Sequence, residues 1–436
     1  FRRVLFRSHV GRNLLTGELE TYMADCVVLA TGGYCSVYQL STNAINSNAS
    51  AIWRCHRRGA YFANPCLIQF HPTSLPEEGG YQSKLTLMSE SLRNDGRVWV
   101  PLKPDKSRPP QEIPEQERDY FLERLYPAYG NLVPRDIASR EALAICREGR
   151  GVGESGRAVY LDFADSRKRL GEDVLRDRYG NLFHMYEEIT GENPYQVPMR
   201  ISPAAHFSMG GLWVDYHLRS NVAGLFVLGE ANFSDHGANR LGANSLLQTM
   251  VDGLFIAPLS VAHELASLLP GAVVPESVTN DAVEQSRKRL AALCESRGSR
   301  TAHEFHVALG DLMRNQVGVS RNRQDLQDAQ NKIVQWTHEF KTDLIVGGSA
   351  QDLNRELEVA GRVQDFLQLA QLMTMDALHR QESCGAHYRA DLEAGRDDDH
   401  FAHIAAWEWT GDPLTANLHL EPLTFEAMPL QKRSYS

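Results

Sequence analysis

The chain has 436 residues, 42% of them hydrophobic, which is enough for a sizeable core and roughly two to four domains. Its formal net charge of -10 excludes a surface built to bind nucleic acid or an anionic membrane, because both need clustered Lys and Arg. The 7 cysteines have no C-x-x-C spacing, so the sequence indicates neither a zinc site nor an iron-sulfur cluster. Small buried thiols in a reducing compartment are expected instead.

The first eight residues stand apart from the rest. The chain opens on Phe1 rather than Met, and the sequence from His9 onward reads as the middle of a domain. We interpret residues 1–8 as a stretch foreign to the protein, to be left out of reasoning about the fold.

The first predicted elements are short strands. Thr16 and Gly17 separate two short strand patterns and predict a hairpin turn. A buried strand is predicted over residues 26–30, and it ends at residues 31–33, Thr-Gly-Gly. Small residues after the carboxyl end of a strand let a cofactor approach the backbone closely. Without other support, an ordinary turn explains the same pattern.

The middle of the chain is broken by Pro and Gly. A charged, proline-rich stretch over residues 103–118 predicts an exposed excursion. Residues 224–230 form a second segment of the type that binds flavins. The apolar run over residues 253–274 is interrupted by prolines and polar groups, which predicts a buried helix rather than a membrane span.

The region over residues 278–380 has a helical pattern. Its apolar positions recur at spacings of three and four, which indicates helix core: Leu353, Leu357, Ala360, Val363, Leu367 and Ala370. Residues 404–409 predict a strand.

Four segments carry residues suited to an anionic substrate. They are Gln69-Phe70-His71-Pro72-Thr73, Ser89-Glu90-Ser91-Leu92-Arg93, Pro134-Arg135-Asp136, and the pair His206 to Gly211 with Gly237 to Gly242. Each segment alone is modest support, since an isolated His or Arg is usually a surface or core group. Their joint presence in this order is specific.

These motifs resemble the flavoprotein subunits of succinate dehydrogenase and fumarate reductase, over essentially everything after Ser8. The resemblance implies an α/β fold in which an incomplete, Rossmann-like FAD-binding domain is interrupted by a capping domain and followed by a helical domain and a small C-terminal domain. The expected boundaries are 1–8 for the foreign stretch, 9–72 and 204–262 for the FAD-binding domain, 73–203 for the capping domain, 263–385 for the helical domain and 386–436 for the C-terminal domain.

The resemblance also implies a catalytic site. A substrate with two carboxylates needs fork-shaped cationic donors, which Arg supplies better than Lys. Arg240 and His206 are expected to bind one carboxylate, with His71 and Ser89 near the other. The catalytic residues implied are Arg135 as proton donor and acceptor, and Glu90 with Arg93 as its relay. Without the resemblance, Glu90 and Arg93 read equally well as a surface ion pair.

FAD is the expected cofactor. Its binding is assigned to Thr31, Gly32, Gly33 and Glu230, and to Asn244, Ser245 and Leu246 at the start of a helix, where free N-H groups favour electron-rich groups. The family's T-G-D-G appears here as Asn48-Ala49-Ser50-Ala51. The family's N-terminal G-x-G-x-x-G loop, the acidic ribose ligand and the histidine that carries covalent flavin would all lie upstream of His9, which predicts a truncated chain.

The predicted function is the interconversion of succinate and fumarate by hydride transfer at FAD. An iron-sulfur subunit would exchange the electrons, a membrane anchor subunit with quinone would complete the complex, and the protein would lie peripherally on the cytoplasmic side of the inner membrane. Two alternatives stay open: an enzyme similar to L-aspartate oxidase, and an inactive fragment. The segment Gly385 to Arg389 suits both flavoenzymes, whereas the ending, residues 432–436, favours the respiratory subunits.

Overall fold

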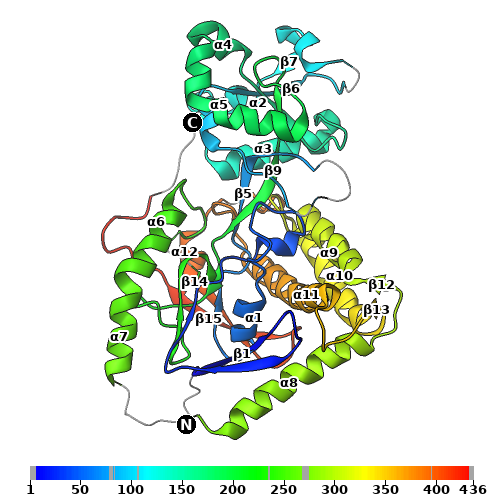
Figure 1. Ribbon diagram of the computed structural model, residues 1–436. Coiled ribbons are helices and arrows are strands. Elements are labelled where there is room, and N and C mark those ends of the chain that lie inside the picture. Colours follow the sequence, from blue (N-terminus) through cyan, green and yellow to red (C-terminus); the bar gives the residue numbers. More distant parts are fainter. Residues whose placement is uncertain are drawn as a thin grey trace. The chain divides into compact units, whose positions relative to one another are not determined.

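The computed structural model describes residues 6–77, 82, 84–105, 108–233, 236–267, 274–393 and 395–431. The chain forms two compact units (Figure 1). The larger unit consists of Phe1–Gln39, Asn43–Ile68 and Phe207–Thr424, and the smaller unit consists of Leu40–Thr42, Gln69–His206 and Phe425–Ser436. The six-part domain division expected from the sequence stays a prediction, and the respiratory-type ending at 432–436 lies outside the described residues.

The larger unit begins with the predicted hairpin. β1 (Ser8–Arg12) pairs antiparallel with β2 (Leu19–Met23). The Asn13 side-chain oxygen accepts hydrogen bonds from the backbone N-H groups of Leu15 and Thr16, which holds the turn. The Phe6 N-H donates to the Ala223 carbonyl. Whether residues 1–8 are foreign stays a prediction.

Two short strands form the sheet that carries the flavin-type segments. β3 (Val27–Leu29) pairs parallel with β11 (Leu225–Val227), with Val27 opposite Leu225. The predicted buried strand is therefore present, though shorter than residues 26–30. The chain leaves β3 toward residues 31–33 and leaves β11 into the short helical turn η7 (Gly229–Ala231). Both flavin-type segments thus follow the carboxyl ends of neighbouring parallel strands, where open α/β sheets bind ligands.

The prediction of a buried helix over residues 253–274 is wrong. α6 (Asn244–Val251), the π-helical turn η8 (Asp252–Ile256) and α7 (Ala257–Ser267) form one continuous helical stretch. By length and composition alone, this stretch is apolar enough to cross a membrane. Its large apolar side chains are exposed, because polar and small residues occupy the side that packs on the unit. Residues 268–273 lie outside the described part.

Four helices make up the predicted helical region: α8 (Glu276–Glu295), α9 (Ala302–Gln316), α10 (Arg323–Thr342) and α11 (Arg355–His379). The other three pack against α11, whose apolar stripe is buried as predicted. Leu353 is the exception, at 58% exposed. The Asn354 side chain accepts from the Leu357 N-H and caps the helix, so Leu353 lies before its first turn.

The remaining elements of the larger unit include an antiparallel sheet. Within the described residues its strand order is β10 (Gly211–Leu212), β4 (Phe62–Ala63), β14 (His403–Trp409) and β15 (Ala416–Pro422). The strand predicted at 404–409 is confirmed by β14. Short elements complete the unit: η1 (Cys35–Tyr38), α1 (Ser50–His56), β12 (Arg300–Thr301), β13 (Leu344–Ile345) and α12 (Asp398–Phe401).

The smaller unit is built around a sheet. Among the described residues its strand order is β5 (Ile68–Ser74), β9 (Met199–Ser208), β8 (Val159–Asp162), β6 (Arg97–Pro101) and β7 (Arg118–Asp119). Its helices are η2 (Glu90–Asn94), α2 (Phe121–Leu125), α3 (Arg135–Ile145), α4 (Ala164–Leu170) and α5 (Glu172–Thr190). Helices thus stand between the strands along the chain, and β6 with β7, β6 with β8 and β8 with β9 pair antiparallel.

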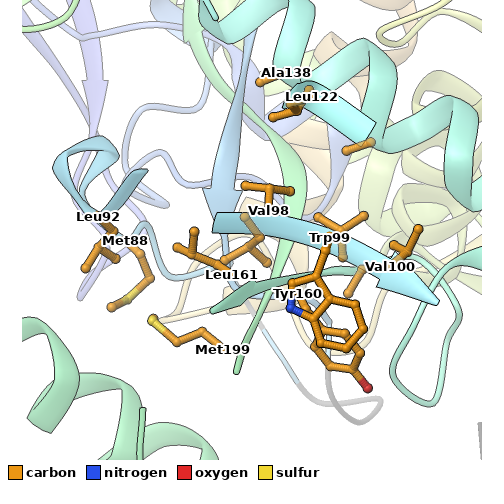
Figure 2. Packing of buried hydrophobic residues seen from close by; sticks show 14 of the residues in the cluster. Met88, Leu92, Val98, Trp99, Val100, Leu122, Ala138, Tyr160, Leu161 and Met199 are labelled. Atoms are coloured by element: carbon orange, nitrogen blue, oxygen red, sulfur yellow. The ribbon is translucent and has the colours of Figure 1, made fainter. Parts of the chain in front are cut away.

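Figure 2 shows the core of the smaller unit, in which Trp99, Tyr160 and Leu161 from neighbouring strands pack with Leu92 and Met199. The described part of the predicted excursion at 103–118 forms two 3-10 turns, η3 (Pro110–Glu112) and η4 (Glu115–Glu117), which are largely exposed. Ile113 between them is buried in this core and holds the excursion against it.

Candidate active site

In the smaller unit, the Glu90 carboxylate accepts hydrogen bonds from two arginines. Arg135 is the first residue of α3, and its Nε donates to Glu90 Oε2 at 2.6 Å. Arg93, three residues beyond Glu90 on η2, donates from Nη2 to Glu90 Oε1 at 2.5 Å. On its other side, Arg135 donates from Nη1 to the side-chain oxygen of Gln69 at 3.0 Å. The three predicted catalytic residues therefore form one connected cluster.

The charges of this cluster keep Glu90 ionised. Burial acts to raise the pKa of Glu90, but the charges and hydrogen bonds of Arg135 and Arg93 outweigh it, so the pKa lies below its ordinary value. The Glu90 side chain is 31% exposed, whereas that of Arg93 is 3% exposed. Glu90 is therefore the member of the predicted relay that meets solvent.

Arg93 has a second set of contacts that explains its burial. Its Nη1 donates to the backbone carbonyls of Asn131 and Val133 at 2.7 and 2.9 Å. This loop leads directly into Arg135 at the start of α3. Burial lowers the pKa of Arg93, with the Glu90 charge opposing. Arg93 therefore fixes the loop that positions Arg135, as well as binding Glu90.

Two of the predicted substrate residues lie together in the same unit. The rings of His71 and His206 meet edge to face, with centroids 4.9 Å apart. His71 Nδ1 lies 3.1 Å from the Thr73 hydroxyl, and His206 Nδ1 lies 2.8 Å from the Thr42 hydroxyl. These bonds occupy Nδ1 of each ring and orient its Nε2 edge.

Ser89 and Arg240 have separate surroundings. Ser89 caps η2, because its hydroxyl accepts from the Ser91 N-H. Arg240 belongs to the larger unit, where it is 7% exposed and its guanidinium carbon lies 4.6 Å from the centre of the Phe207 ring. The substrate-binding roles of both residues stay predictions.

The flavin-type residues of the larger unit meet at Glu230. Glu230 Oε1 accepts from the Ser208 N-H at 2.9 Å and from the Ser208 hydroxyl at 3.0 Å. Gly33 packs directly against this pair, since a Cβ there would lie 2.1 Å from Ser208 Oγ and 2.2 Å from Glu230 Oε1. Gly32 has a φ of +73° beside Ser47, and glycine adopts this backbone without strain. The adjacent Thr31 completes the predicted group at the end of β3.

Glu230 suits a ligand rich in hydroxyl groups. Burial raises the pKa of Glu230, while the bonds from Ser208 and Asn43 and the charge of Arg240 oppose that rise. Among the described residues, no hydrogen-bond donor reaches Oε2, so one oxygen of this half-buried carboxylate is left for a ligand donor. The donor set therefore fits the hydroxyl-bearing part of a flavin cofactor.

The Asp252 carboxylate holds the turn that carries Glu230. Asp252 Oδ2 accepts from the Gly229 N-H at 2.8 Å and from the Asn232 amide at 3.3 Å. Asp252 follows α6, whose first turn contains the predicted cofactor residues Asn244, Ser245 and Leu246. The helix start is therefore where the sequence predicted it, and α6 is tied to the turn that carries Glu230.

Sequence reasoning did not assign site roles to Gln69, Ser208 and Asp252. Gln69 and Ser208 stand inside or beside the recognised motifs, so motif membership was the available signal for them. Nothing local marks Asp252, because it reaches Gly229 only after the chain has passed through α6.

The segment that departs from the family pattern begins a helix. Ala49 is the N-cap of α1 and has a φ of +63°, a left-handed conformation that glycine favours. The family pattern T-G-D-G has Gly at this position. Ser50 stands where that pattern has Asp, so this position offers a hydroxyl rather than a carboxylate.

The Gly385 to Arg389 segment is buried and structural in its contacts. Arg321 Nη1 lies 2.6 Å from His387 Nδ1 and its Nη2 donates to the Cys66 carbonyl. Burial, with the charges of Arg321 and Arg380, holds the pKa of His387 well below its ordinary value. A neutral imidazole can accept the Arg321 hydrogen bond, so this network joins the C-terminal part to β4.

The prediction of buried cysteines holds for three of the 7. All 7 are free thiols, and Cys35, Cys55 and Cys66 are buried, while the others are half-buried. Within the described part of the chain, no group of His, Cys, Asp or Glu side chains has an arrangement suited to a metal ion.

Comparison with known proteins decides the family. The family model for an FAD binding domain matches residues 7–246, and the model for the fumarate reductase flavoprotein C-terminus matches residues 306–435. The chain belongs to the flavoprotein family of succinate dehydrogenase and fumarate reductase. The predicted fold class is thereby confirmed: an FAD-binding domain followed by the flavoprotein C-terminal domain.

Individual members of the flavoprotein family match most of this chain. The succinate dehydrogenase flavoprotein subunit of Bacillus subtilis is 36% identical over 395 residues, which cover 90% of this chain and 64% of that protein. The fumarate reductase flavoprotein subunit of Haemophilus influenzae is 30% identical, with 92% and 64% covered. A solved Escherichia coli quinol fumarate reductase chain superposes with a TM-score of 0.83 at 25% identity, covering 98% of this chain and 71% of that one. The chain thus spans less than two thirds of the length of these curated relatives.

Proposed function

We propose that this flavoprotein interconverts succinate and fumarate at FAD. The proposal applies to the chain joined to the part of its longer relatives that it does not match. The observation that carries the proposal is the Glu90 carboxylate shared between Arg135 and Arg93, with Gln69 on the far side of Arg135. This arrangement fixes an arginine by its partners and connects it to a solvent-exposed acid.

The proposed proton transfer follows from which nitrogens of Arg135 already donate a hydrogen bond. Arg135 uses Nε for Glu90 and Nη1 for Gln69, and no described residue accepts from Nη2. In fumarate reduction, Nη2 gives a proton to one substrate carbon, and Glu90 takes up a proton from solvent and passes it to the neutral guanidine, which restores the guanidinium. Succinate oxidation reverses both transfers. Because a free arginine is a poor base, the neighbouring carboxylate must stabilise the transition state.

The substrate ends would be held by the predicted binding residues. Arg240 and His206 would each bind one carboxylate, Arg240 with a planar fork, and His71 and Ser89 would bind the other. Binding both ends fixes the carbon-carbon bond, and positioning of this kind lowers a barrier by several kcal/mol.

The flavin would be held by Glu230 and the residues around it. Glu230 Oε2 accepts a hydroxyl of the cofactor, and Gly32 with Gly33 lets the cofactor approach the end of β3. Asn244, Ser245 and Leu246 would meet the cofactor at the first turn of α6, where the N-H groups of Asn244 and Leu246 already donate to the Leu241 and Ala243 carbonyls. Bound FAD supplies the hydride acceptor and donor.

The partners are proposed on family membership. Electrons would pass to or from an iron-sulfur subunit, and an anchor subunit with quinone would hold the complex on the cytoplasmic side of the inner membrane. The six domains expected from the sequence, with the cap over residues 73–203, belong to the same proposal.

A paired substitution on α3 tests the proton step. In the completed protein, Arg135→Ala should reduce turnover with an artificial electron donor or acceptor by roughly 10² to 10⁴-fold in both directions, while flavin absorbance is retained. Arg140→Ala is the matched control, because Arg140 lies on the same helix and pairs with Glu141. If Arg135→Ala keeps more than about a tenth of wild-type turnover, the proton comes from another group.

A further inference from the structure

Thr42 is fixed beside His206, one of the predicted substrate residues. The Thr42 N-H donates at 3.0 Å to the carbonyl of Ala205, the residue before His206 in β9. Two residues before Thr42, Leu40 is 3% exposed and belongs to a small apolar cluster of the smaller unit. The backbone around Thr42 is therefore held on both sides, and its β-branched side chain has little rotamer freedom.

The Thr42 hydroxyl has one proton and two acceptors within reach. His206 Nδ1 lies 2.8 Å from the hydroxyl oxygen, and the Ala205 carbonyl oxygen lies 3.3 Å from it. That carbonyl already accepts from the Thr42 N-H, which favours donation of the hydroxyl proton to the nearer nitrogen. A neutral imidazole has one N-H and one bare nitrogen, so an Nδ1 that accepts leaves the ring proton on Nε2.

The other predicted histidine is held less firmly. The Thr73 hydroxyl donates to the Met88 carbonyl at 2.8 Å and lies farther, at 3.1 Å, from His71 Nδ1. His71 Nδ1 is then left with the Thr73 N-H as donor, at a long 3.4 Å. The His71 and His206 rings have centroids 4.9 Å apart, so two positive charges there would repel each other. A ring that donates an N-H while it is neutral avoids this repulsion.

We propose that Thr42 is a positioning residue that keeps the proton of neutral His206 on Nε2. His206 then offers an N-H to an anionic ligand without carrying a charge itself. The tautomer is a property of this chain alone, whereas its use in binding a dicarboxylate rests on the proposed function.

A long-range proton–nitrogen NMR spectrum of the chain with ¹⁵N-labelled histidine tests the tautomer without FAD or substrate. At about pH 8 a histidine of ordinary pKa is neutral. The His206 cross-peaks, identified by their loss in His206→Asn, should place the proton on Nε2 in the wild type and in Thr42→Ser. In Thr42→Val, the Nδ1 resonance should move to that of a nitrogen that accepts no hydrogen bond.

Thr190→Val is the matched control for the spectrum. Thr190 is half-buried in the same unit, and its hydroxyl donates to the Tyr186 carbonyl within α5, so this variant should leave the His206 resonances in place. Cross-peaks of the other histidines report whether each variant is folded. A wild-type proton on Nδ1 would overturn the proposal, as would a His206 spectrum that Thr42→Val leaves unchanged.

The consequence for binding is measured with malonate and the completed, FAD-loaded protein. Thr42→Val should raise the malonate dissociation constant by about threefold to tenfold, because one hydrogen-bond donor is no longer held in place, and Thr42→Ser should stay within about twofold of the wild type. Equal affinity of Thr42→Val and the wild type would remove the positioning role. A wild-type protein that binds no malonate would contradict the proposed function instead, and the spectrum would still decide the tautomer.

Discussion

At the scale of single residues, Glu230 is a half-buried acid for which we propose a role in ligand binding. Its raised pKa means that the folded state holds a proton more tightly than the unfolded state does. Its contribution to stability is therefore fully present below the ordinary pKa of 4.5 and is lost as the pH rises through the folded pKa. Without a ligand donor, the ionised carboxylate destabilises the chain at neutral pH.

Glu230→Gln should therefore stabilise the flavin-free chain at about pH 7 and give no gain below the ordinary pKa, where both side chains are neutral. One pKa unit corresponds to about 1.4 kcal/mol. The amide oxygen can still accept both Ser208 bonds, which converge on one oxygen in the wild type. Melting temperatures across this pH range measure the effect, with Glu188→Gln on exposed α5 as the control. A gain that is the same at every pH would contradict the assignment.

The sequence motifs predicted which residues form the cluster better than they predicted the contacts of those residues. Glu90, Arg93 and Arg135 were recognisable from their segments, and the spacing of three correctly paired Glu90 with Arg93. Arg93 also holds the loop before α3, and the sequence could not predict this role. Its acceptors are the backbone carbonyls of residues 131 and 133, and every residue has such a carbonyl, so residue type does not show which ones accept.

At the scale of elements, the turn η7 depends on a helix that follows it in the chain. Asp252 is 3% exposed and accepts from the Gly229 N-H and the side chains of Asn232 and Gln248. These bonds link the end of β11 to α6. The conformation of the turn that carries Glu230 therefore depends on the hydrogen bonds to the buried Asp252 carboxylate.

Asp252→Ala should lower the free energy of unfolding by about 2–3 kcal/mol, because it leaves buried donors without their acceptor. Urea unfolding measures this loss. Asp281→Ala, an exposed position on α8, should change stability by less than about 0.5 kcal/mol. If the two variants unfold alike, the bonds to Asp252 do not hold the turn.

The prediction of a buried helix was correct for a helix whose apolar side packs on the core, and wrong for a helix whose apolar side does not. The stripe on α11 is buried because three helices pack on it. The run at 253–274 has similar composition, yet its apolar side is exposed. Composition reports how apolar a helix is, and only the fold decides which side is covered.

At the scale of the whole molecule, flavin binding should depend on what lies outside this sequence. The G-x-G-x-x-G string at Gly151 to Gly156 leads into strand β8 rather than into a helix, so within the described residues it does not form the glycine-rich turn before a helix that binds a cofactor diphosphate. We expect the chain alone to bind FAD more weakly than about 1 µM. Isothermal titration of FAD into the flavin-free chain measures this, with the completed protein as the comparison. Sub-micromolar binding by the chain alone would show that the diphosphate is held elsewhere.

The central claim is that this flavoprotein acts on succinate and fumarate, and one measurement tests it most directly. The chain, completed with the part of the B. subtilis relative that it does not match and loaded with FAD, is assayed for steady-state reduction of an artificial electron acceptor by succinate, with aspartate as the competing substrate. Two carboxylate-binding groups and an arginine proton donor predict turnover with succinate, inhibition by malonate and no turnover with aspartate. Turnover with aspartate but not succinate, or no turnover despite a full complement of flavin, would contradict the account.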